Sequence, residues 1–355
     1  TAFELFLGFL MVKMSYFATY IINWYAQNKR DLPWRHTKDP YKIWVSEIML
    51  QQTRVDQGIG YYNRFTSAFP TVQHLANASI DDILKLWQGL GYYSRARNMH
   101  ITAKSIVDGH NGMFPTSYDG LIKLKGVGDY TASAIAAFAF KQPIAAVDGN
   151  VYRIFSRYYG VFTPIDTAQG KTELNALAQE RVDKLQPDTY NQAIMDFCSL
   201  MCSPKKPQCY DCPLIESCYV FRNGVVDKLP VKSKKIPQRT RYFSYLMIKQ
   251  GGYTDINRRQ SKDIWHSLYD FPMIETAAEV EPDGIVNTKE WKELFGKAKV
   301  TLLHVSDLVK YPLSHQKLMT RFYIIELSSS SYLLHGDFIK IKIADLDKYS
   351  TPILI

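Results

Sequence analysis

The sequence predicts a multidomain chain in which an all-α domain is followed by an α+β domain. Apolar residues recur at three- and four-residue spacing from 15 to about 200, and all five cysteines lie between 198 and 218. Segments after 241 are rich in β-branched and aromatic residues and are bounded by polar turns. A length of 355 residues also exceeds what one hydrophobic core usually covers.

Composition narrows the class of protein without naming a function. The chain is 46% hydrophobic and 22% charged, with a net charge of +9 that fits a polyanion partner but does not require one. The apolar start, TAFELFLGFLMV, is too short to span a membrane and lacks the basic leader of a signal peptide, so no membrane partner is expected. Clustered cysteines indicate a local metal site in a reducing compartment, which favours a cytoplasmic location.

The first chemically unusual element is IWVSEIMLQQT, residues 43–53, in which Glu47 stands among apolar residues. A buried, unpaired carboxylate is costly and tends to keep its proton. On this segment alone two interpretations remain open: Glu47 lies on the solvent face of an amphipathic helix, or it is a functional acid.

A glycine hairpin and a second carboxylate follow. In LKGVGDYTASAIAAFAF, residues 124–140, Gly126 and Gly128 permit positive φ and close backbone approach, and the next helix turns its first N–H groups outward. This arrangement suits a DNA phosphate, although a plain helix–turn–helix would look similar. Asp148, in IAAVDGNVYRI, can cap the helix that begins at Gly149 and can also be a functional carboxylate.

The cysteine loop closes the helical half. The spacing C-x6-C-x2-C-x5-C allows four thiolates to converge on zinc or on an iron–sulfur cluster. A fifth cysteine, Cys198, is expected to be a small buried residue and no ligand. The four candidate metal ligands are Cys202, Cys209, Cys212 and Cys218.

This cysteine spacing resembles the [4Fe–4S] loop of the endonuclease III superfamily of DNA glycosylases. The hairpin, with Asp148 some twenty residues beyond it, resembles the same helix-hairpin-helix superfamily. The resemblance implies an all-α helix-hairpin-helix glycosylase domain over 1–225, with one [4Fe–4S] cluster in the loop 202–218. Superfamily members with lyase activity carry lysine where this chain has Tyr130, and tyrosine cannot form a Schiff base. A hydrolytic, monofunctional glycosylase is therefore implied.

Four further segments narrow the resemblance. LPWR (32–35), DPYKIWVSEIMLQQTRV (39–55), GLGYYSRARN (89–98) and VDGNV (147–151) stand in order and strongly resemble the MutY family of adenine DNA glycosylases. That family removes adenine mispaired with 8-oxoguanine. The implied partner is double-stranded DNA with adenine opposite 8-oxoguanine or guanine, bound by a monomer associated with the bacterial nucleoid. A thymine-mismatch glycosylase and a catalytically silent iron–sulfur DNA-binding protein remain as alternatives.

The resemblance also assigns roles to residues. Glu47 is the implied general acid and Asp148 the implied stabiliser of an oxocarbenium-like transition state. The remaining implied substrate and DNA contacts form two groups. A base-separating wedge comprises Tyr92 and Gln52, with Leu50 and Thr53 beside them; an adenine pocket, or support for the acid, comprises Arg30, Trp34, Arg35, Tyr130 and Gln192.

The basic, proline-containing segment 226–240 is predicted to link the domains. IWHSLYDFPMIE, residues 264–275, resembles the signature of the Nudix (MutT)-like domain of the same family, which implies a lesion-recognition domain over 241–355. The Glu-rich metal helix of Nudix hydrolases is missing, so pyrophosphate hydrolysis is disfavoured. In PLSH, Ser314 and His315 are the implied lesion-reading residues, with Leu313 where the family has an aromatic residue.

Overall fold

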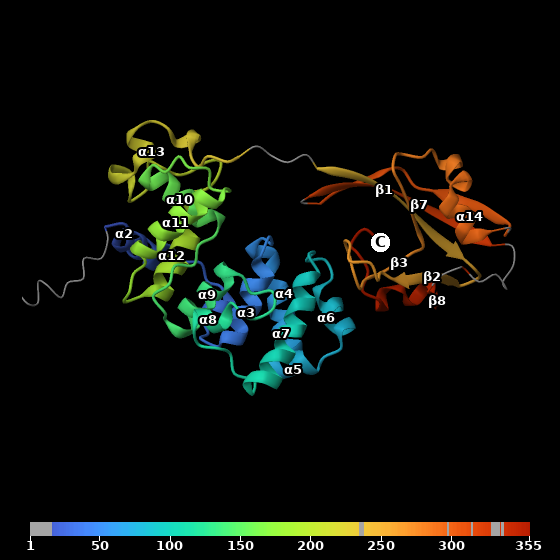
Figure 1. Cartoon of the computed structure of the whole chain (residues 1–355), viewed down its shortest axis with the longest axis horizontal. Coiled ribbons are helices and arrows are strands. Elements are labelled where there is room, and N and C mark those ends of the chain that lie inside the picture. Colours follow the sequence, from blue (N-terminus) through green and yellow to red (C-terminus); the bar gives the residue numbers. More distant parts are fainter. Residues whose placement is uncertain (1–15, 234–237, 297, 314, 328–333, 335–336) are drawn as a thin grey trace, which may run out of the picture. The chain divides into compact units, whose positions relative to one another are not determined.

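The computed structural model describes residues 16–233, 238–296, 298–313, 315–327, 334 and 337–355, so the apolar start and Ser314 lie outside the described residues. The chain divides into two compact units (Figure 1). The first unit comprises residues up to Asn77 together with Asn98–Lys234, and the second comprises Ala78–Arg97 together with Lys235–Ile355. In the part of the chain that is described, no helix is both long and apolar enough to cross a membrane.

The first unit is helical, as predicted. The α-helices that lie wholly or partly in this unit are α2 (Tyr16–Asn28), α3 (Pro40–Leu50), α4 (Val55–Ala68), α5 (Val72–Asn77), α7 (Ser94–His110), α8 (Tyr118–Leu121), α9 (Asp129–Phe140), α10 (Gly149–Tyr159), α11 (Ala168–Arg181), α12 (Pro187–Leu200) and α13 (Tyr219–Arg222).

Helix α9 lies at the centre of this unit. Its residues 131–138 are all buried, because the small side chains of TASAIAAF let neighbouring helices approach on every side. Helices α3 and α12 pack against it, and α4 and α2 pack in turn against those two. Helix α3, which carries the candidate acid Glu47, and helix α12 therefore both contact the central helix α9.

The second unit contains one helix from the N-terminal half of the sequence and an α+β region, which confirms the predicted fold class of the C-terminal part. A five-stranded sheet has the order β4-β1-β7-β5, with β6 also paired to β7, and a three-stranded sheet has the order β3-β2-β8. The elements are α6 (Ile80–Trp87), β1 (Arg239–Lys249), β2 (Tyr253–Arg258), β3 (Tyr269–Asp270), β4 (Met273–Thr276), α14 (Lys289–Phe295), β5 (Val300–Val305), β6 (Val309–Pro312), β7 (Gln316–Leu327) and β8 (Phe338–Lys342).

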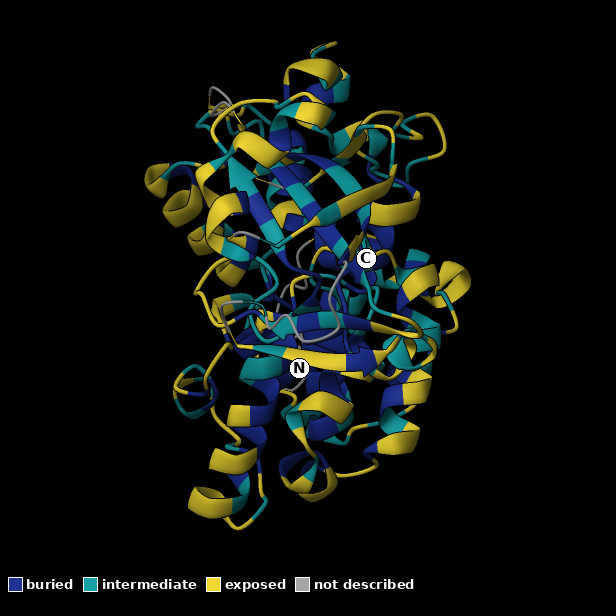
Figure 2. Ribbon diagram, turned by 90° about the vertical axis from the view of Figure 1, so that its right-hand side faces the viewer, coloured by how far each residue is buried: buried dark blue, intermediate teal, exposed yellow. Residues whose placement is uncertain are grey.

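Strands β1 and β7 are the two central strands of the larger sheet. They run parallel, in register from Arg239 opposite Gln316 to Lys249 opposite Glu326, whereas the other pairs are antiparallel. Trp291 and Phe295 of α14 pack on buried residues of these two strands. Figure 2 shows buried residues concentrated along the strands and exposed residues on the outer turns of the helices.

The residue ranges of the two units differ from the predicted domain ranges in two places. Leu229 is buried in the first unit, and the N–H of Ile165 donates to the carbonyl of Val231 at 3.0 Å, so the start of the expected linker packs on the helices. Residues 78–97 group with the sheets, and their hydrogen bonds to the C-terminal part include those of Gln88 with Thr351 and of Arg97 with His266. Neither feature leaves a hydrophobic or compositional signal in the sequence.

Candidate active site and cysteine loop

One cavity of about 1320 Å³ opens in the first unit. Glu47 from α3 and Asp148 from the N-terminus of α10 both line it, as a two-carboxylate site requires. The structure brings most of the candidate residues to this cavity. In addition to the two carboxylates, its walls include Arg30, Trp34, Arg35, Leu50, Gln52, Thr53, Gly128, Tyr130 and Gln192.

Glu47 is buried, with only 7% of its surface exposed, so the solvent-face interpretation is wrong. Burial raises the pKa of Glu47 to about 7, because the carboxylate loses water as a solvating partner; nearby Asp148 adds to the rise. A hydrogen bond from Tyr130 and the charge of Arg35 oppose it. Near neutral pH this carboxyl therefore carries its proton for a substantial fraction of the time.

Asp148 has a different environment in the same cavity. Its Oδ1 accepts hydrogen bonds from the backbone N–H groups of Asn150 and Val151, both at 2.9 Å, and its Oδ2 accepts one from Asn150 Nδ2 at 2.7 Å. Three hydrogen-bond donors and the positive end of the α10 helix dipole therefore face this carboxyl group. The predicted N-cap is confirmed, and it holds the carboxylate in place at the cavity wall.

Arg30 and Arg35 are held by a residue that the sequence analysis missed. Asp196 of α12 is fully buried; its carboxylate lies 2.6 Å from the guanidinium groups of both arginines. These charges lower the pKa of Asp196 against the opposing effect of burial. A carboxylate within the apolar run AIMDFC was the available signal, of the same kind as Glu47.

Two tyrosines from other helices contact residues of α12 that line the cavity. Tyr25 donates to Gln192 Oε1 at 2.9 Å, which orients the amide of Gln192. The Tyr130 hydroxyl lies 3.5 Å from the sulfur of Met195, and burial raises the pKa of Tyr130 well above its usual value. Tyr130 therefore remains a neutral hydrogen-bond donor beside Glu47.

The expected wedge residues fall into two parts of the molecule. Gln52, just beyond α3, has φ +58°, and Leu50 and Thr53 line the cavity beside it. Tyr92 belongs to the second unit, is 42% exposed and has φ +46°. A positive φ is uncommon for both residue types and is often found at functional sites.

The hairpin between α8 and α9 has the predicted form with one correction. Gly126 has φ +77°, and a Cβ there would lie 2.8 Å from Asn98 Cβ, so glycine is required. Gly128 does not have a positive φ; at φ −97° it is the extended N-cap of α9, and space around its Cα is open. The extended geometry arises because the residue before a helix adopts β-region angles.

The four cysteines of the loop 202–218 line one small cavity. Arg157 lies beside it: its Nη1 is 3.5 Å from Cys202 Sγ, and its other hydrogen bonds go to backbone carbonyls of the loop and of Leu229. Cys198 is buried outside this group, as expected. Among the described residues, no three or more His, Cys, Asp or Glu side chains are arranged to hold a single metal ion.

In the second unit, His315 lies at the turn before β7 and is exposed, and its sequence neighbour Ser314 is outside the described residues. His315 belongs to the second unit, whereas the residues that line the cavity belong to the first unit.

Comparison with known proteins identifies the family of this chain. Residues 45–183 match the HhH-GPD superfamily of base excision DNA repair proteins. Adenine DNA glycosylase from Buchnera aphidicola subsp. Schizaphis graminum is 38% identical over 276 residues, which cover 78% of this chain and 77% of the relative. The Homo sapiens adenine DNA glycosylase is 41% identical over 207 residues, covering 56% of this chain and 38% of the relative.

Solved structures resemble the helical part. A thermostable thymine-DNA glycosylase matches 58% of this chain and 95% of its own, with a TM-score of 0.55 and 28% identity. Endonuclease III in a trapped covalent intermediate with DNA matches 58% of this chain and 94% of its own, with a TM-score of 0.51. At 22% identity, the second match shows the fold alone.

Fold and cavity together define a helix-hairpin-helix DNA glycosylase. Within that class the extensive identity is with the adenine-specific relatives. The chain belongs to the adenine DNA glycosylase family, and it excises adenine from DNA in base excision repair.

Proposed function

We propose that the chain hydrolyses the N-glycosidic bond of adenine opposite 8-oxoguanine or guanine, with Glu47 as the acid and Asp148 as the electrostatic stabiliser. The observation that carries this proposal is the pairing of two carboxyl groups in one cavity, one with a pKa of about 7 and one that accepts three hydrogen bonds. Such a division of roles is what acid-assisted glycoside cleavage needs.

The chemistry follows from these two environments. Glu47 donates its proton to N7 of the flipped adenine, so the electron pair of the breaking C1′–N9 bond leaves on a neutral base. Positive charge develops on the sugar ring and is stabilised by the Asp148 carboxylate. Water then attacks C1′, loses a proton and leaves an abasic site.

Tyr130 supports a monofunctional reaction. It occupies the position at which lyases of the superfamily carry lysine, it remains protonated, and it hydrogen-bonds to Glu47. Strand cleavage by Schiff-base chemistry is therefore not expected, and the abasic product should persist until alkali is added.

Incubation with duplexes that hold adenine opposite 8-oxoguanine, guanine or thymine tests the proposal. Abasic product from the first two duplexes only, independent of magnesium, is the expected result. Release of thymine from a mismatch would favour the thymine-glycosylase alternative, and binding without any base release would favour a silent DNA-binding protein.

We further propose that Cys202, Cys209, Cys212 and Cys218 hold one [4Fe–4S] cluster. The donor set fits, because four thiols line one cavity beside the buried guanidinium of Arg157. This cation would offset the negative charge that four thiolates bring. A bound cluster would cross-link the loop, and Lys205 and Lys206 in its first segment would then be presented to a DNA phosphate.

Freshly purified protein is expected to be brown and to contain about four iron atoms per chain. Cys212→Ser should lower this iron content, whereas Cys198→Ser should not, because Cys198 lies outside the cysteine-lined cavity. Metal analysis of anaerobically purified protein measures both variants. Stoichiometric zinc in place of iron would contradict the assignment.

The C-terminal part of the second unit is proposed to be a Nudix-like domain that reads the base opposite adenine, with Ser314 and His315 as contacts. Its mixed sheet with a single packed helix is compatible with that class. Glu290 and Glu293 of α14 are both exposed, and Glu293 pairs with Lys289 at 3.3 Å. A monomer acting in the bacterial cytoplasm, near the nucleoid, completes the proposal.

A further inference from the structure

A turn of the second unit, residues 264–268, has an unusual backbone. Trp265 and Ser267 have φ +59° and +69°, on either side of His266. Two left-handed positions in non-glycine residues of one short turn cost energy and persist only when the surroundings hold them.

Three arginines hold this turn by its carbonyl oxygens. Arg259 Nε donates to Ile264 at 3.1 Å, and Arg258 Nε donates to Ser267 at 3.4 Å. The third donor is Arg97 of α7, whose Nη1 lies 2.6 Å from the carbonyl oxygen of His266. Arg97 is therefore the one of the three that comes from the N-terminal half of the sequence.

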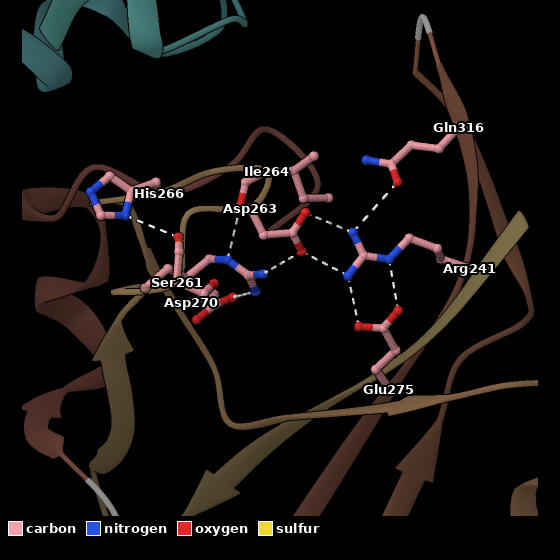
Figure 3. A network of polar contacts seen from close by, with 9 residues as sticks. Arg241, Ser261, Asp263, Ile264, His266, Asp270, Glu275 and Gln316 are labelled. Atoms are coloured by element: carbon pink, nitrogen blue, oxygen red, sulfur yellow. Dashed lines mark hydrogen bonds and ion pairs between the residues drawn. The ribbon is translucent and has the colours of Figure 1, made fainter. Parts of the chain in front are cut away.

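The strand side of the turn is anchored by a charge network (Figure 3). Arg241 forms paired contacts with Glu275, at 2.7 Å each, and with Asp263, at 2.9 and 2.7 Å. Arg259 contacts Asp270 at 2.8 Å. Because both arginines are buried and both are paired, the segment 259–270 forms a rigid support.

Residues 78–97 make further contacts with Arg258 at the end of β2 and with the C-terminal segment 347–351. Asp81 pairs with Arg258 at 2.9 Å, and its carbonyl accepts from Ser350 at 3.4 Å. Gln88 Nε2 donates to Thr351 Oγ1 at 3.1 Å, and the Lys85 ammonium contacts the carbonyl of Asp347. Together with Arg97, these contacts bracket the loop 88–93 on both sides.

The loop itself is held from within. Arg95 donates to the carbonyls of Leu90 and Gly91 at 3.3 and 3.1 Å, and its guanidinium lies over the Trp87 ring. Tyr92, at the exposed tip, adopts a positive φ. The loop 88–93 is thus held from within, and the residues on either side of it contact the same part of the second unit as the turn 264–268.

We propose that Arg97 and the Asp81–Arg258 pair are positioning residues, which fix the Tyr92 loop to the C-terminal sheet region so that this region sets where Tyr92 enters the DNA. The inference rests on the proposed wedge role of Tyr92. It assigns to Arg97 a part in discriminating the base opposite adenine without contact to either reacting carboxylate.

The test uses full-length, iron-loaded protein and a duplex that carries 2-aminopurine next to 8-oxoguanine, whose fluorescence rises when the step is unstacked. Arg97→Gln is expected to reduce that rise and to lower the ratio of excision rates opposite 8-oxoguanine and opposite guanine by about tenfold. Arg321→Gln, which removes an ion pair with Glu279 at 3.1 Å in the same unit, is the matched control and should change neither quantity.

A charge exchange keeps the test independent of folding, since Asp81 and Arg258 are both partly exposed. Asp81→Arg and Arg258→Asp should each weaken discrimination, and the double exchange should restore the part that depends on the ion pair, although not the part that depends on the hydrogen bond from Arg258 to Ser267. If Tyr92→Ala changes neither fluorescence nor excision, the wedge role in the proposed function fails. If Tyr92→Ala acts but Arg97→Gln and the exchanges behave like Arg321→Gln, the positioning role alone is overturned.

Discussion

Glu47→Gln is expected to abolish adenine release, lowering the single-turnover rate by about 10³-fold or more, while binding to the mispaired duplex persists. Glutamine keeps the shape and polarity of the side chain but has no acidic proton to give N7. Single-turnover excision and a parallel binding titration measure the two properties. Glu173→Gln, an exposed change on α11, serves as the control, and retained turnover in Glu47→Gln would remove Glu47 from its role.

The same variant has a predicted effect on stability. The native pKa of about 7 exceeds the ordinary value of 4.5, so the folded state keeps a proton that the unfolded chain loses between these pH values. The free energy of unfolding therefore falls as pH rises through this window, and the full cost is present above it. Glu47→Gln should be more stable than the parent by up to about 3 kcal/mol at pH 8 and should match it near pH 4.

Asp148→Asn should lower the excision rate by about 10²- to 10³-fold, because it removes the charge that stabilises the developing oxocarbenium ion. The fold should tolerate this change: the asparagine oxygen can still accept the N–H groups of Asn150 and Val151 as an N-cap. The loss of stability should stay within about 1 kcal/mol.

Asp39→Asn is the matched control for that substitution. Asp39 caps α3 by accepting the Tyr41 N–H at 2.9 Å, and it lies outside the cavity wall. Thermal unfolding should show similar small changes in both variants, whereas excision kinetics should separate them. A similar excision rate in both variants would mean that Asp148 acts only as a helix cap.

The sequence carried most of the information on element type. The small-residue run in α9 and the richness of β1 and β7 in β-branched and aromatic residues are local patterns, and local patterns predict helices and strands well. Asp148 as an N-cap could be predicted for the same reason, since capping depends on only three neighbouring residues.

Features that depend on tertiary partners leave no such local pattern in the sequence. The burial of Glu47 depends on the packing of α3 against other helices, and the role of Asp196 depends on arginine partners that lie more than 160 residues away. The extended geometry of Gly128 and the grouping of residues 78–97 with the second unit likewise result from packing. Sequence spacing cannot report such contacts.

The most direct measurement is the pKa of Glu47 itself. Glutamate labelled with ¹³C at the carboxyl carbon would be titrated by NMR in the full-length protein, and the resonance lost in Glu47→Gln would identify the group. A midpoint near 7 is predicted, because burial disfavours the charged form. A midpoint near 4.5 would mean that this carboxyl is ionised at neutral pH, and the proposed acid would then have no proton to donate.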